Sequence, residues 1–257
     1  MSYKIVKDYI PESKYNIKCP YTMEPEGVTV HNTANDADAK NEGDYMESNS
    51  NMISFHVAVD DKEVRLKIPF DRNAFHAGDG AIGRGNRKMI GVEICYSRSG
   101  GTRFTKAEKN AAAYIASILY KRGWGIDKVY RHKDFSGKDC PHRTMKKGWT
   151  RFKKMIQKEL DALKEKEVPN YKVGNTYAIQ CELTVRKNAG TKYEKKKHAE
   201  LTKAGQKCDK DKDGAMDKGT KVTCKEIKKL SDGSIWMKIP SGWICAYGGK
   251  TKTIYVK

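Results

Sequence analysis

The chain has 257 residues, enough for two domains, and its 51 Lys and Arg residues against 32 Asp and Glu residues give a net charge of +19. No apolar run approaches the roughly 20 residues that span a bilayer, which excludes a transmembrane helix, and the start of the sequence lacks an apolar segment of signal-peptide length. We therefore expect synthesis in a cytoplasm and, for any work outside the cell, release by another route.

The positive charge is concentrated in the last third of the chain. Up to Pro169 the sequence has 31 Lys and Arg residues against 23 Asp and Glu residues, whereas the remainder has 20 against 9, so the net charges are +8 and +11. Such an excess predicts a polyanionic partner for the tail: nucleic acid, anionic lipid or the phosphate-rich polymers of a cell wall. Composition does not choose among the three.

Seven cysteines are scattered along the chain. Because their number is odd and no signal peptide precedes them, they are predicted to be reduced thiols. Pairing among the last four, in the C-terminal part, remains open.

Strand and helix patterns alternate through the first two thirds. β-branched, partly alternating runs predict strands at 27–31, 54–59, 64–68 and 89–96, with a hairpin turn at 60–62. The capping-box sequence from Thr105 to Glu108 predicts the start of a helix that ends near Gly123. Apolar residues at helical spacing predict a last helix at about 150–166. This order of elements predicts a mixed α/β domain.

The last third has a different pattern. Residues 164–171 are charged and include a proline, as is typical of a linker. Short strand-like runs then alternate with turns, which is typical of a small all-β domain; they lie at 177–181, 183–186, 221–227, 235–239 and 242–246. The sequence thus predicts a first domain at 1–163, a linker at 164–171 and a second domain at 172–257.

Two histidines and one cysteine are candidate metal ligands. His31 ends the first predicted strand, and His132 and Cys140 lie in one run, HKDFSGKDCPH. Imidazole and thiolate ligands suit zinc, and three protein ligands leave a coordination position open, as in catalytic zinc sites. The spacing alone also fits unrelated histidines and a loop cysteine, so both interpretations stay open on this pattern.

Five separated motifs give the chain a specific resemblance over about residues 20–165. They occur in family order: HNTA at 31–34, FH at 55–56, FHAGDG at 75–80, GVEIC at 91–95 and the run from 132 to 141. In these the chain resembles the type 2 N-acetylmuramoyl-L-alanine amidases, which include phage endolysins and share their fold with peptidoglycan recognition proteins. The resemblance implies a central mixed β-sheet flanked by helices, with Zn2+ held in a groove by His31, His132 and Cys140. Since the non-catalytic recognition branch typically lacks the cysteine, Cys140 favours an enzyme.

Two further residues are candidate catalytic groups. Glu93 lies in an otherwise apolar strand, where an unpaired carboxylate is costly, so it is either a salt-bridge partner or a general base acting on water. The resemblance implies the second role, because a glutamate at this position is regarded as catalytic in similar phage amidases. Lys138 stands two residues before Cys140, and the resemblance implies a cation that stabilises an oxyanion rather than a solvated lysine.

Other side chains near these motifs are assigned to the substrate groove or the core. His76, Asn32 and Phe55 are expected to line the groove. Phe55 stands where some relatives carry a tyrosine. Unlike tyrosine, phenylalanine has no hydroxyl group and cannot donate a proton. His56 is expected to be a core histidine or to support a metal ligand, and His198, in a lysine-rich stretch, is expected to be solvated.

Short motifs in the tail resemble a bacterial SH3-type wall-binding domain. They are LTVR at 183–186, GTKY at 190–193, GTKVTC at 219–224 and the pattern from Trp236 to Ile244, and residues 200–218 resemble an insertion. Within it, DKDKDG at 209–214 copies the start of a calcium loop, but Thr220 occupies the place of the glutamate that such loops require. A polar loop is therefore the favoured interpretation.

These predictions describe an endolysin or autolysin that uses zinc to hydrolyse the amide bond between N-acetylmuramic acid and L-alanine of peptidoglycan. The basic tail is expected to bind the anionic polymers of a Gram-positive wall, and the enzyme to act after release from the host bacterial cytoplasm. The alternative is a non-catalytic peptidoglycan-binding protein. A nucleic-acid binder is argued from charge alone, and the sequence has no recognisable nucleic-acid motif. It does not indicate an oligomeric state.

Overall fold

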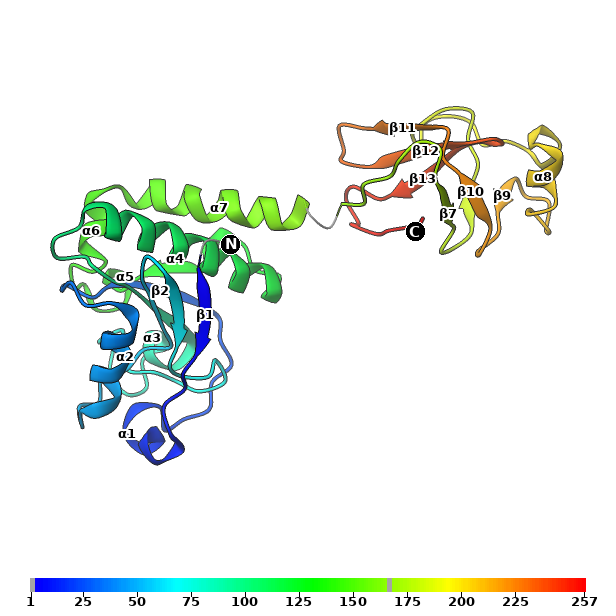
Figure 1. Cartoon of the computed structure of the whole chain (residues 1–257). Helices are drawn as coiled ribbons and strands as arrows, with labels where there is room; N and C mark the ends of the chain where they lie inside the picture. The colour runs from blue at the N-terminus through cyan, green and yellow to red at the C-terminus, as the bar shows by residue number, and fades with distance from the viewer. Residues whose placement is uncertain (1–2, 166–167) are drawn as a thin grey trace. The chain divides into compact units, whose positions relative to one another are not determined.

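The computed structural model describes residues 3–165 and 168–257, which belong to two compact units, Met1–Lys164 and Glu165–Lys257 (Figure 1). Each unit has its own hydrophobic core. The predicted linker at 164–171 includes residues 166–167, which lie outside the described residues, and its last residue, Tyr171, is buried in the second core. None of the described helices combines the length and the apolar character needed to cross a lipid bilayer.

A six-stranded mixed sheet forms the centre of the first unit, in the order β1-β4-β3-β5-β2-β6. Its strands are β1 (Lys4–Lys7), β2 (Gly27–Asn32), β3 (Val57–Val59), β4 (Glu63–Leu66), β5 (Met89–Ile94) and β6 (Val129–Arg131). Strands β3 and β4 pair antiparallel across the predicted turn at 60–62, and the other pairs are parallel. Strands β2, β3 and β5 are buried over nearly their whole length because helices cover both faces of the sheet.

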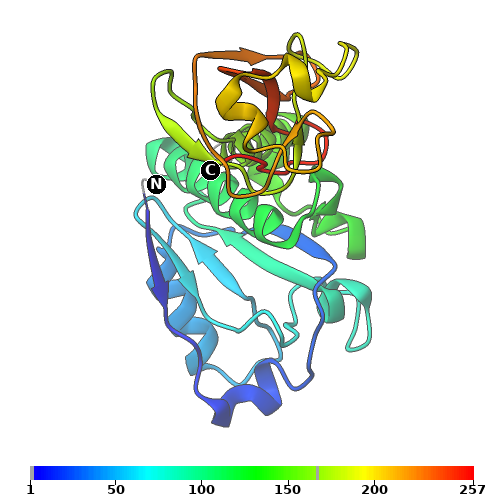
Figure 2. The same cartoon turned by 90° about the vertical axis from the view of Figure 1, so that its right-hand side faces the viewer.

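Helices α4 and α7 lie side by side along one face of this sheet, and α2 lies over the opposite face (Figures 1 and 2). The helices of the unit are α1 (Tyr15–Lys18), α2 (Ala39–Ser48), α3 (Arg84–Lys88), α4 (Gly101–Arg122), α5 (Lys133–Ser136), α6 (His142–Lys146) and α7 (Trp149–Glu165). The apolar stripes of α4 and α7 are fully buried against the strands at Ile115, Leu119, Phe152 and Ile156. The predicted α/β domain with a central mixed sheet is confirmed.

Helix α4 begins at Gly101, before its predicted start at Thr105. The residue ahead of it, Gly100, has a positive φ of 78°, which suits glycine. The Thr105 hydroxyl donates a hydrogen bond to the Gly101 carbonyl (3.0 Å) and is therefore satisfied inside the helix. The predicted capping box is wrong for this reason, whereas the predicted end at Gly123, in the left-handed conformation, is confirmed.

The second unit consists mainly of short antiparallel strands. A three-stranded sheet has the order β11-β12-β13, and β10 pairs with β7 and β8 with β9. The elements are β7 (Thr176–Ala178), β8 (Leu183–Thr184), α8 (Lys203–Gln206), β9 (Ala215–Met216), β10 (Lys221–Thr223), β11 (Glu226–Lys229), β12 (Ile235–Ile239) and β13 (Gly242–Tyr247). The single strand predicted at 221–227 is divided into β10 and β11, which pair with different neighbours. This architecture is compatible with the small all-β domain predicted for the tail.

Candidate metal centre

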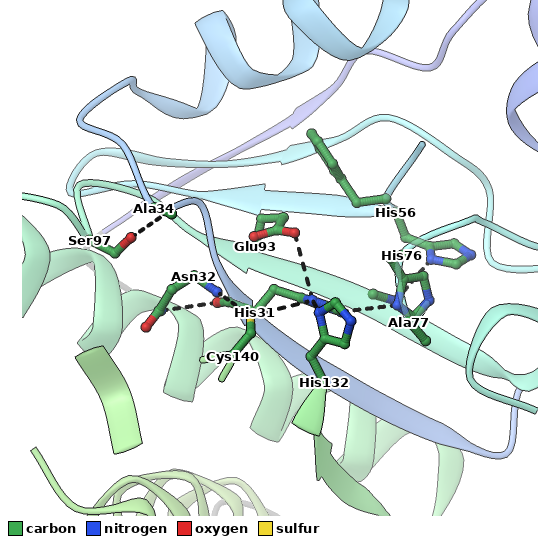
Figure 3. A network of polar contacts seen from close by, with 12 residues as sticks. His31, Asn32, Ala34, His56, His76, Ala77, Glu93, Ser97, His132 and Cys140 are labelled. Atoms are coloured by element: carbon green, nitrogen blue, oxygen red, sulfur yellow. Dashed lines mark hydrogen bonds and ion pairs between the residues drawn. The ribbon is translucent and has the colours of Figure 1, made fainter. Parts of the chain in front are cut away.

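Three candidate ligands meet at the carboxyl edge of the sheet (Figure 3). His31 lies in β2, His132 directly follows β6, and Cys140 lies between α5 and α6. Because β2 and β6 are parallel neighbours, their ends reach the same edge, and the His132 amide donates a hydrogen bond to the Val30 carbonyl (3.2 Å). One ligand atom of each of the three residues lies within 4.8 Å of the others.

The donor atoms of this cluster suit zinc. The Nδ1 atoms of His31 and His132 are 3.0 Å apart, and Cys140 Sγ is 3.8 Å from His31 Nδ1. All three side chains are buried. Two imidazole nitrogens that face each other beside a thiol, with no carboxylate among the three, make a borderline-to-soft donor set that Zn2+ prefers and that Mg2+ or Ca2+ does not.

Burial sets the protonation of these ligands in the metal-free protein. It lowers the pKa of His31 well below the usual value and lowers that of His132, so both rings are neutral and can offer a lone pair. Burial, reinforced by the nearby Glu93, raises the pKa of the Cys140 thiol to about 12. The thiol is therefore protonated near neutral pH and must lose its proton to become a ligand.

Glu93 stands beside His31 because of the strand register. The two residues are direct partners in the parallel pair β2–β5, so both side chains lie on the sheet face below α2, and Glu93 Oε1 is 3.8 Å from His31 Nδ1. Glu93 Oε2 is buried and has no hydrogen-bond partner in the described parts of the chain. Burial, with a contribution from Glu42, raises the pKa of Glu93 to about 8. Among the described residues, its only possible ion-pair partner is His31, whose ring burial keeps neutral, so a salt bridge at the strand end does not form.

Zinc binding is expected to release protons and to tighten as the pH rises. Cys140 loses one proton on ligation, and a cation near His31 lowers the raised pKa of Glu93, so part of a second proton leaves below about pH 8. The neutral histidines release none. The apparent zinc Kd should therefore fall about tenfold per pH unit, and more steeply below about pH 8. Calorimetry in buffers of different ionisation enthalpy counts the protons, and a Kd that does not change with pH contradicts this.

A chain of hydrogen bonds through His76 determines which nitrogen of His31 is free. His76 Nε2 lies 3.1 Å from the Met89 carbonyl, which can only accept, so Nε2 carries the hydrogen and Nδ1 carries the lone pair. His31 Nε2 is 3.0 Å from this Nδ1 and must donate to it, which leaves His31 Nδ1 unprotonated and facing the cluster. Burial lowers the pKa of His76 to about 3 and keeps it neutral. Gly91 makes room for the ring, because a Cβ there would lie 2.7 Å from His76 Cδ2.

Replacing His76 by phenylalanine should keep the ring volume and remove the acceptor for His31 Nε2. We expect zinc affinity to fall about 10- to 100-fold, the range for losing a hydrogen-bond partner of a metal ligand. Titration with a zinc chelator of known affinity measures the change. His56→Phe is the matched control, since the His56 ring is hydrogen-bonded to the Arg72 carbonyl and the Gly91 amide and to none of the clustered ligands, among the residues described. Its loss should reduce stability and leave zinc affinity within about threefold. Equal zinc affinities of wild type and His76→Phe would contradict the role of His76.

The other residues predicted to line the groove, and Lys138, lie around the cluster but differ in burial and in their contacts. Asn32 is buried, and its Oδ1 accepts hydrogen bonds from the Arg143 and Thr144 amides (3.0 and 3.1 Å), so its side chain holds the start of α6. Phe55 is buried in the first core and also lines the cavity over the cluster. Lys138 is exposed on the rim of this cavity, close enough for its charge to lower the pKa of His31 and His132.

The cavity over the cluster measures about 680 Å3, and one of its walls was not predicted. Tyr45 and Met46 of α2, together with Met52 and Ile53 after it, line that wall. Helix α2 is polar over most of its length, so its sequence, AKNEGDYMES, has no apolar stripe that would have revealed it. The signal that was present is the adjacent pair Met52-Ile53 in an otherwise polar stretch.

In the second unit, Asp209, Asp211 and Asp213 form a carboxylate cluster, as the calcium-loop pattern indicates. The buried Asp209 already accepts hydrogen bonds from the Asp213 and Gly214 amides (3.0 and 2.9 Å). It also pairs with His198 Nδ1 at 2.9 Å. The expectation that His198 is simply solvated is wrong, because the buried carboxylate takes it as a partner.

Comparison with known proteins shows which family this chain resembles in sequence. The family model for N-acetylmuramoyl-L-alanine amidase matches residues 21–143. N-acetylmuramoyl-L-alanine amidase CwlA of Bacillus subtilis (strain 168) is 48% identical over 200 residues, which cover 77% of this chain and 70% of the relative. XlyB, an amidase of the same strain, is 53% identical over 162 residues, covering 63% of this chain and 51% of XlyB, so the chain spans about half of that relative.

Solved structures agree in fold. PlyL is 50% identical with a TM-score of 0.58, and the match covers 60% of this chain and 96% of PlyL. The PlyG catalytic domain is 49% identical with a TM-score of 0.59, covering 61% of this chain and 95% of that domain. The catalytic domain of XlyA is 37% identical with a TM-score of 0.54, covering 60% of this chain and 99% of that domain.

Proposed function

The chain belongs to the N-acetylmuramoyl-L-alanine amidase family and hydrolyses peptidoglycan between N-acetylmuramic acid and L-alanine, and we propose that it does so with Zn2+ held by His31, His132 and Cys140. The observation that carries the metal assignment is the buried set of two Nδ1 atoms and one thiol at the edge of the sheet. A protein that only binds peptidoglycan is not favoured, because relatives 48% and 53% identical are amidases.

When bound, zinc supplies Lewis-acid chemistry, lowering the pKa of water and polarising the amide carbonyl. Glu93 is the general base in this proposal. Its carboxylate takes a proton from the attacking water and gives it to the leaving nitrogen of L-alanine as the C–N bond breaks. The unpartnered Oε2 and the position of Glu93 beside His31 support this assignment.

Lys138 places a cation on the rim of the same cavity. We assign it to the carbonyl oxygen of the scissile amide, where negative charge develops as water adds. Its side chain is exposed and lines the cavity that the substrate amide would enter. Phe55 offers no hydroxyl, so proton transfer to the leaving group falls to Glu93.

The second unit is proposed to be an SH3-type domain that holds the enzyme on the anionic polymers of a Gram-positive wall. Its short antiparallel strands support this, as does the net charge of +11 in the sequence after Pro169. With this anchor the protein would act as an endolysin or autolysin on the wall of a Gram-positive bacterium.

The test is product analysis on purified Gram-positive peptidoglycan. New L-alanine amino termini should appear without new reducing sugars, a chelator should stop their release, and added zinc should restore it. Reducing sugars would identify a glycosidase and overturn the site assignment. Full activity in a chelator that leaves no measurable zinc on the protein would overturn the metal.

A further inference from the structure

Lys18, the last residue of α1, is completely buried, and in the described part of the chain its ammonium is hydrogen-bonded to an amide oxygen and two main-chain carbonyls rather than to a carboxylate. Its Nζ donates hydrogen bonds to Asn49 Oδ1 (2.9 Å), the Asn51 carbonyl (2.6 Å) and the Ile53 carbonyl (3.2 Å). These three acceptors use all three hydrogens of the ammonium. Since an ammonium buried without an opposite charge is costly, the geometry of this loop is what compensates Lys18.

The loop at 49–53 depends on Lys18 in turn. It joins α2 to the segment before β3 and belongs to no helix or strand. Within it, the Asn51 amide donates to Asn49 Oδ1 (2.9 Å), the same oxygen that accepts from Lys18. At its end, Ser54 Oγ donates to the Lys18 carbonyl (2.6 Å). Lys18 therefore holds the loop through its ammonium and through its main chain.

This loop carries large apolar side chains into solvent at the mouth of the metal-site cavity. Met52 is 60% exposed and Ile53 67%, and Tyr45 of α2, also 67% exposed, lines the same wall. Isolated exposed apolar residues are ordinary, but three on one wall of a cavity mark a binding surface. The wall is continuous with the cluster, because one cavity contains both.

Peptidoglycan presents two different flanks to this cavity. The stem peptide carries carboxylates. The positive charge of the exposed Lys138 attracts them to its side of the cavity, and the negative charge of Glu42 repels them from the side formed by α2. The glycan presents the apolar C–H faces of its sugar rings and N-acetyl methyl groups, which suit a tyrosine ring, a methionine and an isoleucine. We propose that Tyr45, Met52 and Ile53 bind the glycan strand beside the scissile bond, and that Lys18 is the positioning residue that holds this wall.

The inference rests on the proposed function, so its test measures binding rather than turnover. The probes are a two-repeat glycan of alternating N-acetylglucosamine and N-acetylmuramic acid with stem peptides, and N-acetylmuramoyl-L-alanine alone. The double variant Met52→Ser/Ile53→Ser should weaken binding of the longer glycan about tenfold and that of the single-sugar probe less than about twofold. Calorimetry on the metal-free protein gives both Kd values.

Lys18→Met should weaken glycan binding by a similar factor and keep zinc binding. It should also speed amide hydrogen exchange at 49–53 alone, whereas general destabilisation of the core would speed exchange in other segments as well. If this variant does not fold, the double surface variant decides. Ile5→Ser is the matched control, since Ile5 is an exposed apolar residue of β1 outside the cavity, and it should change neither Kd. Unchanged glycan binding by the double variant, or equal weakening for both probes, would overturn the inference. Amidase activity, measured separately, tests the proposed function.

Discussion

Cys140→Ser is expected to lose zinc and, with it, at least about a thousandfold in amidase rate, because the metal contributes several kcal/mol of transition-state stabilisation. Serine is close in size, so the fold should persist, but a buried hydroxyl does not ionise at neutral pH and is a poor zinc ligand. The Asn32 amide, which donates to Cys140 Sγ at 3.4 Å, keeps an acceptor in the variant. Zinc content by elemental analysis and release of L-alanine amino termini measure the two effects.

Cys95→Ala is the matched control for Cys140→Ser. Cys95 is a free cysteine buried just after β5, and it is not one of the three clustered ligands. Its loss should cost about 1 kcal/mol of stability for the missing sulfur and leave zinc content and rate nearly unchanged. A Cys140→Ser protein that keeps stoichiometric zinc and full activity would show that the thiol is not a ligand.

Glu93→Gln is expected to reduce kcat about 10²- to 10⁴-fold while zinc remains bound, since the amide cannot take a proton from water. The change preserves side-chain shape, and Glu93 is not among the clustered ligand residues, so zinc content should equal that of wild type. The variant should also release fewer protons on binding zinc than the wild type, because the carboxyl whose pKa burial raises to about 8 is gone. Single-turnover kinetics with zinc-loaded protein measure the loss.

Glu42→Gln provides the control within the same cavity. Burial raises the pKa of Glu42 as well, but its Oε1 accepts a hydrogen bond from Asn35 Nδ2, a contact that glutamine can keep. We expect a change of less than about threefold in kcat. If the two variants lost activity equally, the general effect of cavity charge, and not proton transfer by Glu93, would account for both.

The buried strands and the long helices were predictable because burial leaves a strong pattern in the sequence. Strand β2 has the β-branched run 28–30 before His31, and α7 keeps its apolar stripe, so both were found close to their observed ends. Strand β1, which reads KIVK, is short and mostly exposed, and β6 has three residues; neither gives a periodic signal. The first owes its place to parallel pairing with β4, which only the folded sheet reveals.

The candidate site was predictable as a set of residues but not as a network. The motifs indicated His31, His132, Cys140 and Glu93 one by one, and the structure brings them together. The connection from His31 through His76 to a carbonyl depends on the register of β2 with β5 and on the space above Gly91, neither of which sequence spacing encodes. The buried Lys18 gave no signal at all, because a lysine in a polar helix reads as a surface residue.

The hydrogen-bond chain from His31 through His76 ends on the main-chain carbonyl of Met89, so its last acceptor does not depend on which side chain stands at position 89. A side-chain partner for His76 could be lost by one substitution or altered by protonation, but a main-chain oxygen is supplied by whatever residue stands at that position. As long as the first residue of β5 keeps its place in the sheet, both rings inherit their tautomers from the backbone. The lone pair that His31 offers is thus specified by the path of the polypeptide, as long as His76 and the space above Gly91 are kept.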